Sequence, residues 1–511
     1  MKRISGLVLS AAIAMVGCSK SYYDSANVNP NQSTNASVDL VLSNALTRTA
    51  APQVATYAVF SEWMNYWSPS GSYAINSSDG SSYKQTTDFA DNNGLWTAIY
   101  DNLEDYDYIE KTATASNQYF YIAAAKTMKA YLFQQLVDMY SNVPYTEALQ
   151  GASNLTPKYD DGKVIYEDLA NQLTTAVSLF QRADANGSLT QDVLFGSTPM
   201  AAQGVTSWTG AQQNAQWAKF ANTLKLRLLI RQTQVAGRAG YIQTEANKIV
   251  ANGAGFLTQY DAAINPGYIN SSGKQNPFYA FGYNVSGTFT QDFWRAAKFN
   301  VDFATAHNDP RLGRWYAPIS NGQFVGTTLG ASGNPVGSAS STWGPGVLKS
   351  FAQSSPLLSV SESWFLQAEA ILRGYLAGND LAAVNNGITS SFVSLGLTAA
   401  QASTYYSQAG DKEVNYAACV TFNEKLNCIM RQKWLALQDV NPFETWSNYR
   451  RLFSLGLPWS SQIVISQNPG RDADAIPVRI LYPTIEYQTN AANVGAQGTP
   501  NHHTTKIWWM P

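Results

Sequence analysis

Long segments in which apolar residues recur every three or four positions constrain the fold of this 511-residue chain most strongly. One such face comprises Phe120, Ala124, Met128, Tyr131, Gln135 and Met139. This spacing is that of one side of an α-helix. Segment 217–231, WAKFANTLKLRLLIR, is apolar nearly all round, which predicts a deeply packed helix. The sequence therefore indicates a mostly α-helical fold.

Helix boundaries can also be predicted locally. Ser359 and Glu362 have the spacing of a capping box, and Gly374 stands where the helix that follows would end. Leu426, Met430, Trp434 and Leu437 form a further helical face. Helices of this length arriving in pairs indicate stacked helix hairpins, although no repeat of fixed period is present.

Two long segments lack helical periodicity, about 254–358 and 456–511, and the first is rich in Gly, Ser, Asn and Pro. Long loops in a compact protein are usually functional. We expect both to be irregular insertions within a single domain spanning residues 37–511.

The amino-terminal end has the layout of a secretory signal. Lys2 and Arg3 precede an apolar run, residues 7–16, that is too short to span a bilayer and is followed by Cys18. We predict a signal peptide at 1–17, lipidation of Cys18 and a polar tether at 18–36, because a cysteine just after the cleavage point resembles a bacterial lipobox. The alternative is an ordinary signal peptide with an incidental cysteine.

Composition limits the possible partners. The net charge of −2 provides no basic field for nucleic acid. Aromatic residues make up 13% of the chain, and they serve cores as well as surfaces that stack on sugar rings. No further apolar run is long enough to cross a membrane.

Catalytic signatures are missing. The chain has three histidines, His307, His502 and His503, and no zinc-protease, redox-cysteine, hydrolase-elbow or phosphate-loop motif. We predict no catalytic residue, no cofactor and no metal site. Contact with a metal is an alternative for the His502–His503 pair, which we expect to face solvent. Paired carboxylates suffice for glycoside hydrolysis, so a hydrolase remains an alternative.

Two local features stay open at this point. Segment 88–94 is rich in oxygen ligands and fits calcium binding, but a helix cap explains it equally well. Cys419 and Cys428 are too far apart to bond on one helix, whereas a disulfide is feasible if Cys419 lies in the loop before it.

Several segments together resemble the SusD/RagB family of outer-membrane nutrient-binding lipoproteins. In order along the chain they are NPN (29–31), LVDMYSNVPYTEAL (136–149), PKYDDGKVIYEDL (157–169), WAKFANTLKLRLLIR (217–231), DPRL (309–312), SESWFLQAEAILRG (361–374), RQKWLAL (431–437), YRR (449–451) and IPVR (476–479). We interpret these segments as architecture rather than as a binding site.

The resemblance implies a mostly α-helical fold in which four tetratricopeptide-like helix pairs form a scaffold and irregular loops pack on one side. It also implies a lipid-anchored protein of the outer membrane, facing the cell exterior. The implied partner is a TonB-dependent (SusC-like) transporter, and the implied ligand is an oligosaccharide, with peptide as a variation.

Aromatic residues in the irregular segments are the better ligand candidates, because sugar rings present apolar C–H faces that stack on Trp and Tyr. These candidates are Trp67, Tyr73, Tyr83, Tyr279, Tyr283 and Trp343. We therefore predict a non-enzymatic binding protein that delivers nutrient oligomers to a transporter. The alternatives are a surface glycan hydrolase and a purely structural helix-repeat lipoprotein.

Overall fold

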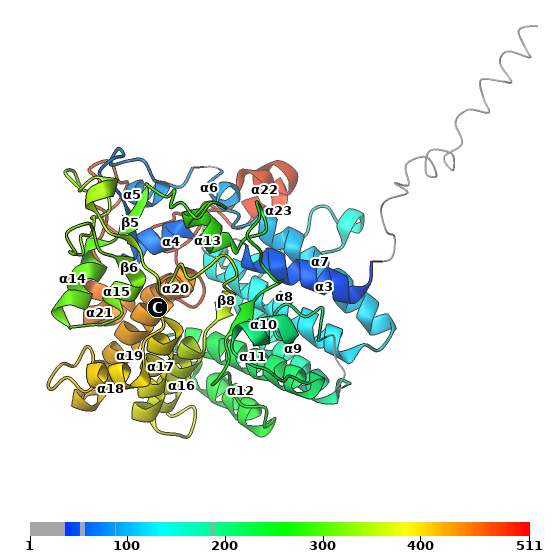
Figure 1. Ribbon diagram of the computed structural model, residues 1–511. Helices are drawn as coiled ribbons and strands as arrows, with labels where there is room; N and C mark the ends of the chain where they lie inside the picture. Colours follow the sequence, from blue (N-terminus) through cyan, green and yellow to red (C-terminus); the bar gives the residue numbers. More distant parts are fainter. Residues whose placement is uncertain (1–35, 52–56, 87, 185–188) are drawn as a thin grey trace, which may run out of the picture.

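The computed structural model describes residues 36–51, 57–86, 88–184 and 189–511 (Figure 1). Cys18 and the predicted signal peptide lie outside these residues, as does nearly all of the predicted tether. The first described helix, α3, begins at Val38, one residue after the expected start of the folded body. No helix of the described residues is both long and apolar enough to cross a membrane.

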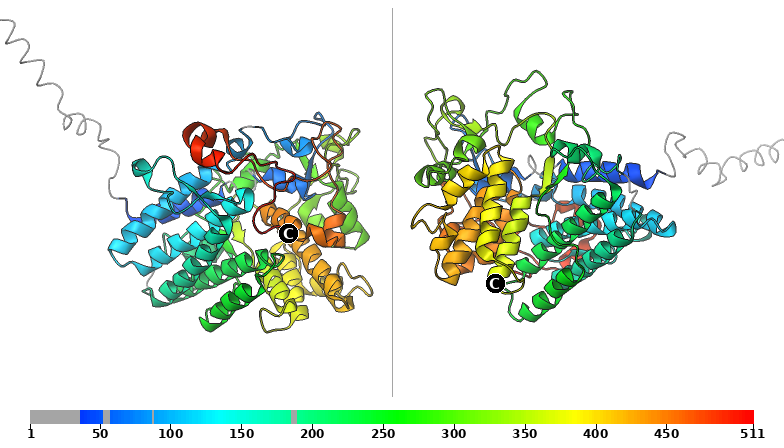
Figure 2. Two further views of the ribbon diagram at one scale, coloured as in Figure 1. Left: turned by 180° about the vertical axis from the view of Figure 1, so that it is seen from behind. Right: turned by 60° about the horizontal axis from the view of Figure 1, so that its bottom comes forward.

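The longer helices stack side by side and form what we call the helical layer, which extends from the right-hand side across the lower part of Figure 1 and is seen from two other sides in Figure 2. Each packs against its neighbours in the stack, as α7 against α8 and α16 against α17, which confirms a mostly α-helical fold of tetratricopeptide-like pairs. These helices are α3 (Val38–Ala50), α7 (Thr97–Ala115), α8 (Tyr119–Tyr140), α9 (Gly162–Arg182), α11 (Gly210–Arg231), α12 (Ala239–Ala251), α16 (Val360–Leu372), α17 (Asp380–Ser394), α18 (Ala399–Tyr406), α19 (Phe422–Leu437) and α20 (Pro442–Leu452).

The predicted helical faces are buried. The residues from Phe120 to Met139 that define the first face all lie on α8 and are buried in the protein core. Ser359 caps α16 as predicted, since its hydroxyl accepts from the Glu362 amide at 3.1 Å. The Glu362 carboxylate does not complete the capping box and instead binds Arg227. Gly374 follows the end of α16 with φ +79°, a conformation that glycine adopts without strain.

Helix α11 is deeply packed, as its sequence predicts, but it also buries charges. Arg227 makes two 3.0 Å hydrogen bonds to Glu362 of α16. Arg231 pairs with Glu444 of α20. Arg451 of α20 reaches Glu369 of α16 at 2.6 Å. Each carboxylate thereby has an arginine partner, and these pairs tie three helices that are distant in sequence.

Shorter elements and extended chain cover one side of the helices, at the top and upper left in Figure 1. We call residues 64–86 and 254–358 the loop layer, because they contain little regular structure. Its elements are β1 (Trp67–Pro69), α5 (Asp79–Ser82), β4 (Ala262–Ile264), α13 (Pro277–Gly282), β5 (Trp294–Ala296), α14 (Lys298–Ala306), α15 (Leu312–Trp315), β6 (Tyr316–Ala317), η2 (Gly337–Ala339), β7 (Thr342–Trp343) and β8 (Ser355–Leu358).

The strands of the loop layer form short antiparallel pairs, β1 with β5, β4 with β8 and β6 with β7. In the first pair Trp67 lies opposite Ala296. The Ala296 amide donates to the Ser341 carbonyl at 2.8 Å, which brings β7 beside β5. Two pairs distant in sequence are thereby joined, and Trp67 and Trp343 come together.

The remaining elements are short. They are α4 (Ala58–Trp63), α6 (Phe89–Asn92), β2 (Val143–Pro144), η1 (Gly151–Ser153), β3 (Tyr159–Asp160), α10 (Ser197–Ala202), η3 (Tyr416–Ala418), η4 (Phe453–Leu455), α21 (Pro458–Ser461), α22 (Thr484–Thr489) and α23 (Ala491–Gly495). Segment 456–511 is thus irregular apart from its last three short helices.

Contacts describe the two local features that the sequence left open. Asp91 accepts hydrogen bonds from the amide and hydroxyl of Thr97 at 3.2 and 2.8 Å, so this carboxylate caps the start of α7. Cys419 follows η3, in the loop before α19, and Cys428 lies within α19; both are buried free thiols. A hydrogen bond between them lowers the pKa of Cys419 and contributes to the raised pKa of Cys428.

Candidate functional site

A chain of touching aromatic rings runs through the loop layer. We call it the aromatic network, and its members are Tyr73, Phe293, Trp294, Trp67, Phe278, Phe281, Trp343, Phe289, Tyr283 and Tyr279. Five of the six predicted ligand residues belong to it. The structure therefore brings together side chains as far apart in the sequence as Trp67 and Trp343.

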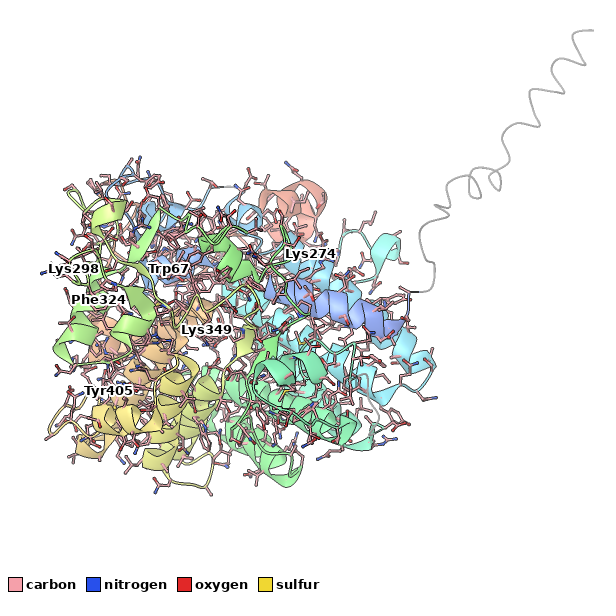
Figure 3. The ribbon with its side chains drawn as sticks, viewed as in Figure 1. Trp67, Lys274, Lys298, Phe324, Lys349 and Tyr405 are labelled. Atoms are coloured by element: carbon pink, nitrogen blue, oxygen red, sulfur yellow. The ribbon has the colours of Figure 1, made fainter. Side chains whose placement is uncertain are left out.

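The middle of the network is core. Trp67 and Trp343 are 1% and 5% exposed, and their ring centroids lie 4.9 Å apart (Figure 3 labels Trp67). The indole N–H of Trp67 donates to Asp439 at 2.6 Å. The prediction that these two tryptophans meet a ligand is corrected by their burial, because the β1–β5 and β6–β7 pairings turn both inward.

One end of the network reaches the surface at Tyr73, which is 42% exposed. Its ring meets Phe293 edge to face at 4.8 Å, and Phe293 in turn contacts Trp294 at 4.5 Å. An aromatic ring held by other rings keeps one face free for stacking at low entropic cost. Tyr73 has the placement expected of a ligand contact.

The backbone around Tyr73 is held by neighbouring segments. The Ser70 amide donates to the Phe293 carbonyl at 2.7 Å, and the Gly71 amide donates to the Pro335 carbonyl at 2.8 Å. A Cβ on Gly71 would lie 1.8 Å from the Asn334 carbonyl oxygen, so only glycine permits this approach.

Polar groups adjoin the same end. Arg295 donates to the Gly337 carbonyl at 3.0 Å, which joins two segments distant in sequence, and to the Asp292 carboxylate of its own segment at 2.7 Å. Burial lowers the pKa of the Arg295 guanidinium, while Asp292 and the nearby Tyr73 oppose that shift. The Asp292 side chain is 54% exposed. It presents a carboxylate beside an exposed ring, a combination suited to a sugar hydroxyl.

The other end of the network is a pair of half-buried tyrosines. The rings of Tyr279 and Tyr283 are stacked, with centroids 5.0 Å apart and planes 17° apart. Asn276 sets their position, because its side chain caps α13 at 3.0 Å from the Tyr279 amide and also donates to Ser355 of β8 at 2.9 Å. Both tyrosines are half-buried and stay candidates for a ligand contact.

Tyr83 belongs to a different cluster. It is fully buried, its ring packs against Trp63 at 6.4 Å, and its hydroxyl accepts from the Ser466 amide at 2.7 Å. Its φ of +59° lies in the left-handed region. The expectation that Tyr83 contacts a ligand is therefore corrected: a loop residue that sequence places at the surface fills a gap beneath the loop.

Asp292, Phe293 and Trp294 are the site residues that sequence reasoning missed. Asp292 and Phe293 directly precede β5 and Trp294 is its first residue, in an irregular segment where no periodicity marks a face. Two aromatic residues next to an aspartate in an irregular segment could have marked these residues as ligand candidates. What could not be foreseen is that β5 pairs with β1 and so carries these residues to Tyr73.

The chain belongs to the SusD-like family described as starch-binding, associating with outer membrane, whose model matches residues 30–483. This is a family of nutrient- and carbohydrate-binding proteins of the outer membrane, and its members are generally binding proteins rather than enzymes. No curated protein sequence matches the chain.

Solved structures share the fold. A SusD/RagB family protein from Bacteroides thetaiotaomicron is 20% identical, with a TM-score of 0.72 and coverage of 93% of this chain and 99% of that one. A SusD homolog from Bacteroides fragilis is 18% identical, with a TM-score of 0.72 and coverage of 93% and 99%. A chitin-binding SusD homolog from Flavobacterium johnsoniae is 20% identical, with a TM-score of 0.71 and coverage of 92% and 98%.

Proposed function

We propose that this protein is a lipid-anchored, non-enzymatic binding protein on the outside of the outer membrane that captures nutrient oligosaccharides. The observation that carries the proposal is the end of the aromatic network at Tyr73, where an exposed ring adjoins the exposed Asp292 carboxylate on a backbone fixed by Arg295. A rigid ring beside a hydrogen-bond acceptor fits a sugar better than a flexible peptide, because the sugar offers a flat apolar face edged with hydroxyls.

The site favours binding over hydrolysis. The carboxylate that the described part of the site presents is that of Asp292. It forms an ion pair with Arg295 at 2.7 Å. A glycosidase needs a second carboxyl group roughly 5–10 Å away, one of the two with a raised pKa. The aromatic network supplies stacking surface and no proton donor of that kind.

An array of glycans and peptides probed with the purified protein tests the proposal. We expect signals on one class of oligosaccharide, and we expect the recovered oligomer to be intact after incubation. Strong signals confined to peptides would change the ligand class. Release of shorter sugars in excess over protein, abolished by one Asp or Glu substitution, would instead support the hydrolase.

Delivery of the ligand requires a partner, which we propose to be a TonB-dependent barrel transporter. Cys18→Ala tests the anchor: the protein should leave the membrane fraction or stay unprocessed. Purification in mild detergent tests the partner: the unaltered protein should be recovered with a large barrel protein and remain bound in raised salt, because the chain carries little charge. Recovery alone, with uptake unaffected by deletion, would favour the structural alternative.

A further inference from the structure

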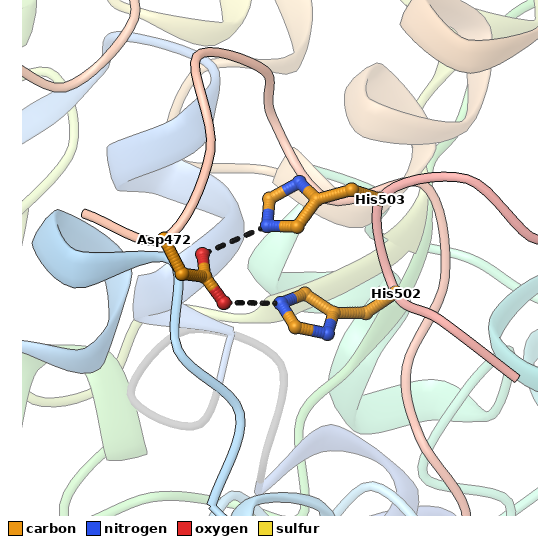
Figure 4. A group of neighbouring side chains, drawn as sticks. All are labelled: Asp472, His502 and His503. Carbon is orange, nitrogen blue, oxygen red and sulfur yellow. Dashed lines mark hydrogen bonds and ion pairs between the residues drawn. The ribbon is translucent and has the colours of Figure 1, made fainter.

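Two of the three histidines of the chain meet on one carboxylate (Figure 4). The Nε2 atom of His502 lies 3.0 Å from Oδ2 of Asp472, and the Nε2 atom of His503 lies 2.9 Å from Oδ1. Their side chains are 12% and 9% exposed, so the expectation that this pair faces solvent is wrong. The pair points inward, at an acid 30 residues away.

Backbone contacts hold the three residues in place. The carbonyl oxygen of His502 accepts from the Val478 amide at 2.7 Å, and the Asp472 amide donates to the Ser82 carbonyl at 3.1 Å. The His503 amide donates to the side chain of Asn501 at 2.8 Å. Three segments distant in sequence are thus joined at this point, and the arrangement does not depend on a single mobile loop.

The ligand set matches a divalent transition cation. Two imidazole nitrogens and one carboxylate oxygen are typical zinc ligands, and one donor atom from each residue lies within 4.8 Å of the others. Tetrahedral coordination at about 2.0–2.1 Å places ligand atoms about 3.3–3.4 Å apart. The 3.0 and 2.9 Å spacings are hydrogen-bond distances from the two imidazoles to different oxygens of Asp472, so an ion would replace these hydrogen bonds and move each nitrogen a few tenths of an ångström from its oxygen.

The outer contacts also suit a metal. His502 hydrogen-bonds to the backbone of Tyr83, and such a bond orients a metal-binding imidazole through the ring nitrogen that does not face the ion. The Nδ1 atom of His503 is buried with no hydrogen-bond partner, so this imidazole lacks such an outer bond and is positioned by ring packing against Tyr83 at 6.2 Å. The Asp472 side chain is 29% exposed, so water can reach the remaining coordination position.

From this geometry we propose that Asp472, His502 and His503 bind one Zn²⁺ ion, with water completing the coordination. The ion ties the carboxyl-terminal segment to the loop at 472, and the hydrogen bond from His502 to Tyr83 links both to the loop layer. Among the described residues no other three histidine, cysteine or acidic side chains come together in this way.

The chain offers a matched control at His307. Its Nδ1 atom lies 2.6 Å from Asp411, which makes a histidine–aspartate pair without a second imidazole. His307→Gln removes one histidine and one ion pair but no proposed ligand, so it separates loss of a metal site from loss of a polar contact.

The test is a zinc titration of the tag-free, chelator-treated full chain, followed by isothermal calorimetry, metal analysis after dialysis and thermal unfolding. We expect one equivalent of Zn²⁺, a higher Tm with Zn²⁺ and no such effect of Mg²⁺ or Ca²⁺. Asp472→Asn, His502→Gln and His503→Gln should each weaken binding at least tenfold, while His307→Gln should bind like the unaltered protein.

Cobalt provides a readout that needs no variant. Co²⁺ bound through two imidazoles at low coordination number gives visible absorption that Zn²⁺ displaces, and we expect this spectrum from the unaltered protein. Less than a tenth of an equivalent of Zn²⁺, or no displaceable Co²⁺ absorption, would overturn the proposal. So would undiminished Zn²⁺ binding in folded His502→Gln and His503→Gln variants.

Discussion

The helical layer and the loop layer are held together by different interactions. In the helical layer, long amphipathic faces pack and buried arginine–carboxylate pairs such as Arg451–Glu369 fix the neighbours. In the loop layer, strand pairs of two to four residues support a continuous set of aromatic rings around Trp67 and Trp343. The helical layer is thus a scaffold that buries arginine–carboxylate pairs in its interior. The loop layer leaves the two ends of its aromatic network at the surface, where a ligand can reach them.

The two layers also differ in the ionisation of their buried acids. Arginine partners hold the pKa of Glu369 and Glu444 in the helical layer at about 2, although burial opposes the shift. At the edge of the loop layer, burial raises the pKa of Asp439 to about 7 and that of Glu62 to about 8. Protonation of Glu369 and Glu444 at low pH therefore lowers the stability of the fold. Ionisation of Asp439 and Glu62 lowers it as the pH rises.

The largest effect is expected from Trp67→Ala. This residue fills the centre of the aromatic network, and its loss leaves a cavity and takes the hydrogen-bond donor from Asp439. The free energy of unfolding should fall by about 3–5 kcal/mol in urea denaturation. A loss below about 1 kcal/mol would show that the aromatic network does not support the loop layer.

Arg451→Met tests the helical layer. It leaves the buried Glu369 carboxylate with Arg373 alone, so we expect a loss of about 3 kcal/mol. Arg48→Met is the control, because the Arg48–Asp105 pair is largely exposed and should contribute less than about 1 kcal/mol. Equal losses in the two variants would remove the distinction between buried and exposed pairs.

Asp439→Asn tests the pH dependence. The raised pKa means that the folded protein holds a proton between about pH 4 and pH 7 that the unfolded chain releases, so stability falls as the pH rises through that range. Asparagine keeps the acceptor for Trp67 and tolerates the φ of +57° at this position.

Relative to this variant, the unaltered protein should lose about 2–3 kcal/mol between about pH 5 and pH 8. Denaturation curves of both proteins across that range measure the difference. Parallel stability profiles would mean that Asp439 titrates normally and that its environment is wetter than its burial indicates.

Tyr73→Ala should have the smallest effect on stability. The ring is 42% exposed and contacts the network through Phe293 alone among its rings, so the free energy of unfolding should change by less than about 1 kcal/mol. Thermal unfolding beside Trp67→Ala is the measurement. A large loss would place Tyr73 with the supporting rings rather than with the ligand surface.

Periodicity predicted the helical layer because packing in a helix stack repeats along the chain. The faces of α8 and α11 could be found in the sequence for that reason. The partners of the buried charges could not: Arg227 lies on a helix expected to be apolar, and its carboxylate is 135 residues away.

The exposure of individual rings in the loop layer could not be predicted from the local sequence. Trp67 and Tyr73 are six residues apart in one irregular segment, yet they are 1% and 42% exposed. Their difference arises from pairing with β5, more than 220 residues further along, so the local sequence predicted the right segments without predicting which rings face outward. The prediction that His502 and His503 face solvent was wrong for the same reason, because Asp472 approaches them only in the folded chain.

The most direct test of the account compares ligand binding at two equally exposed tyrosines. Tyr73 is 42% exposed within the aromatic network, and Tyr487 is 45% exposed on α22, outside it. Calorimetric titration of the oligosaccharide found on the array should show that Tyr73→Ala weakens binding by about 1–3 kcal/mol, while Tyr487→Ala leaves it unchanged. Normal binding by folded Tyr73→Ala, and by the Tyr279→Ala and Tyr283→Ala variants, would contradict the claim that the exposed ends of the network form the binding site.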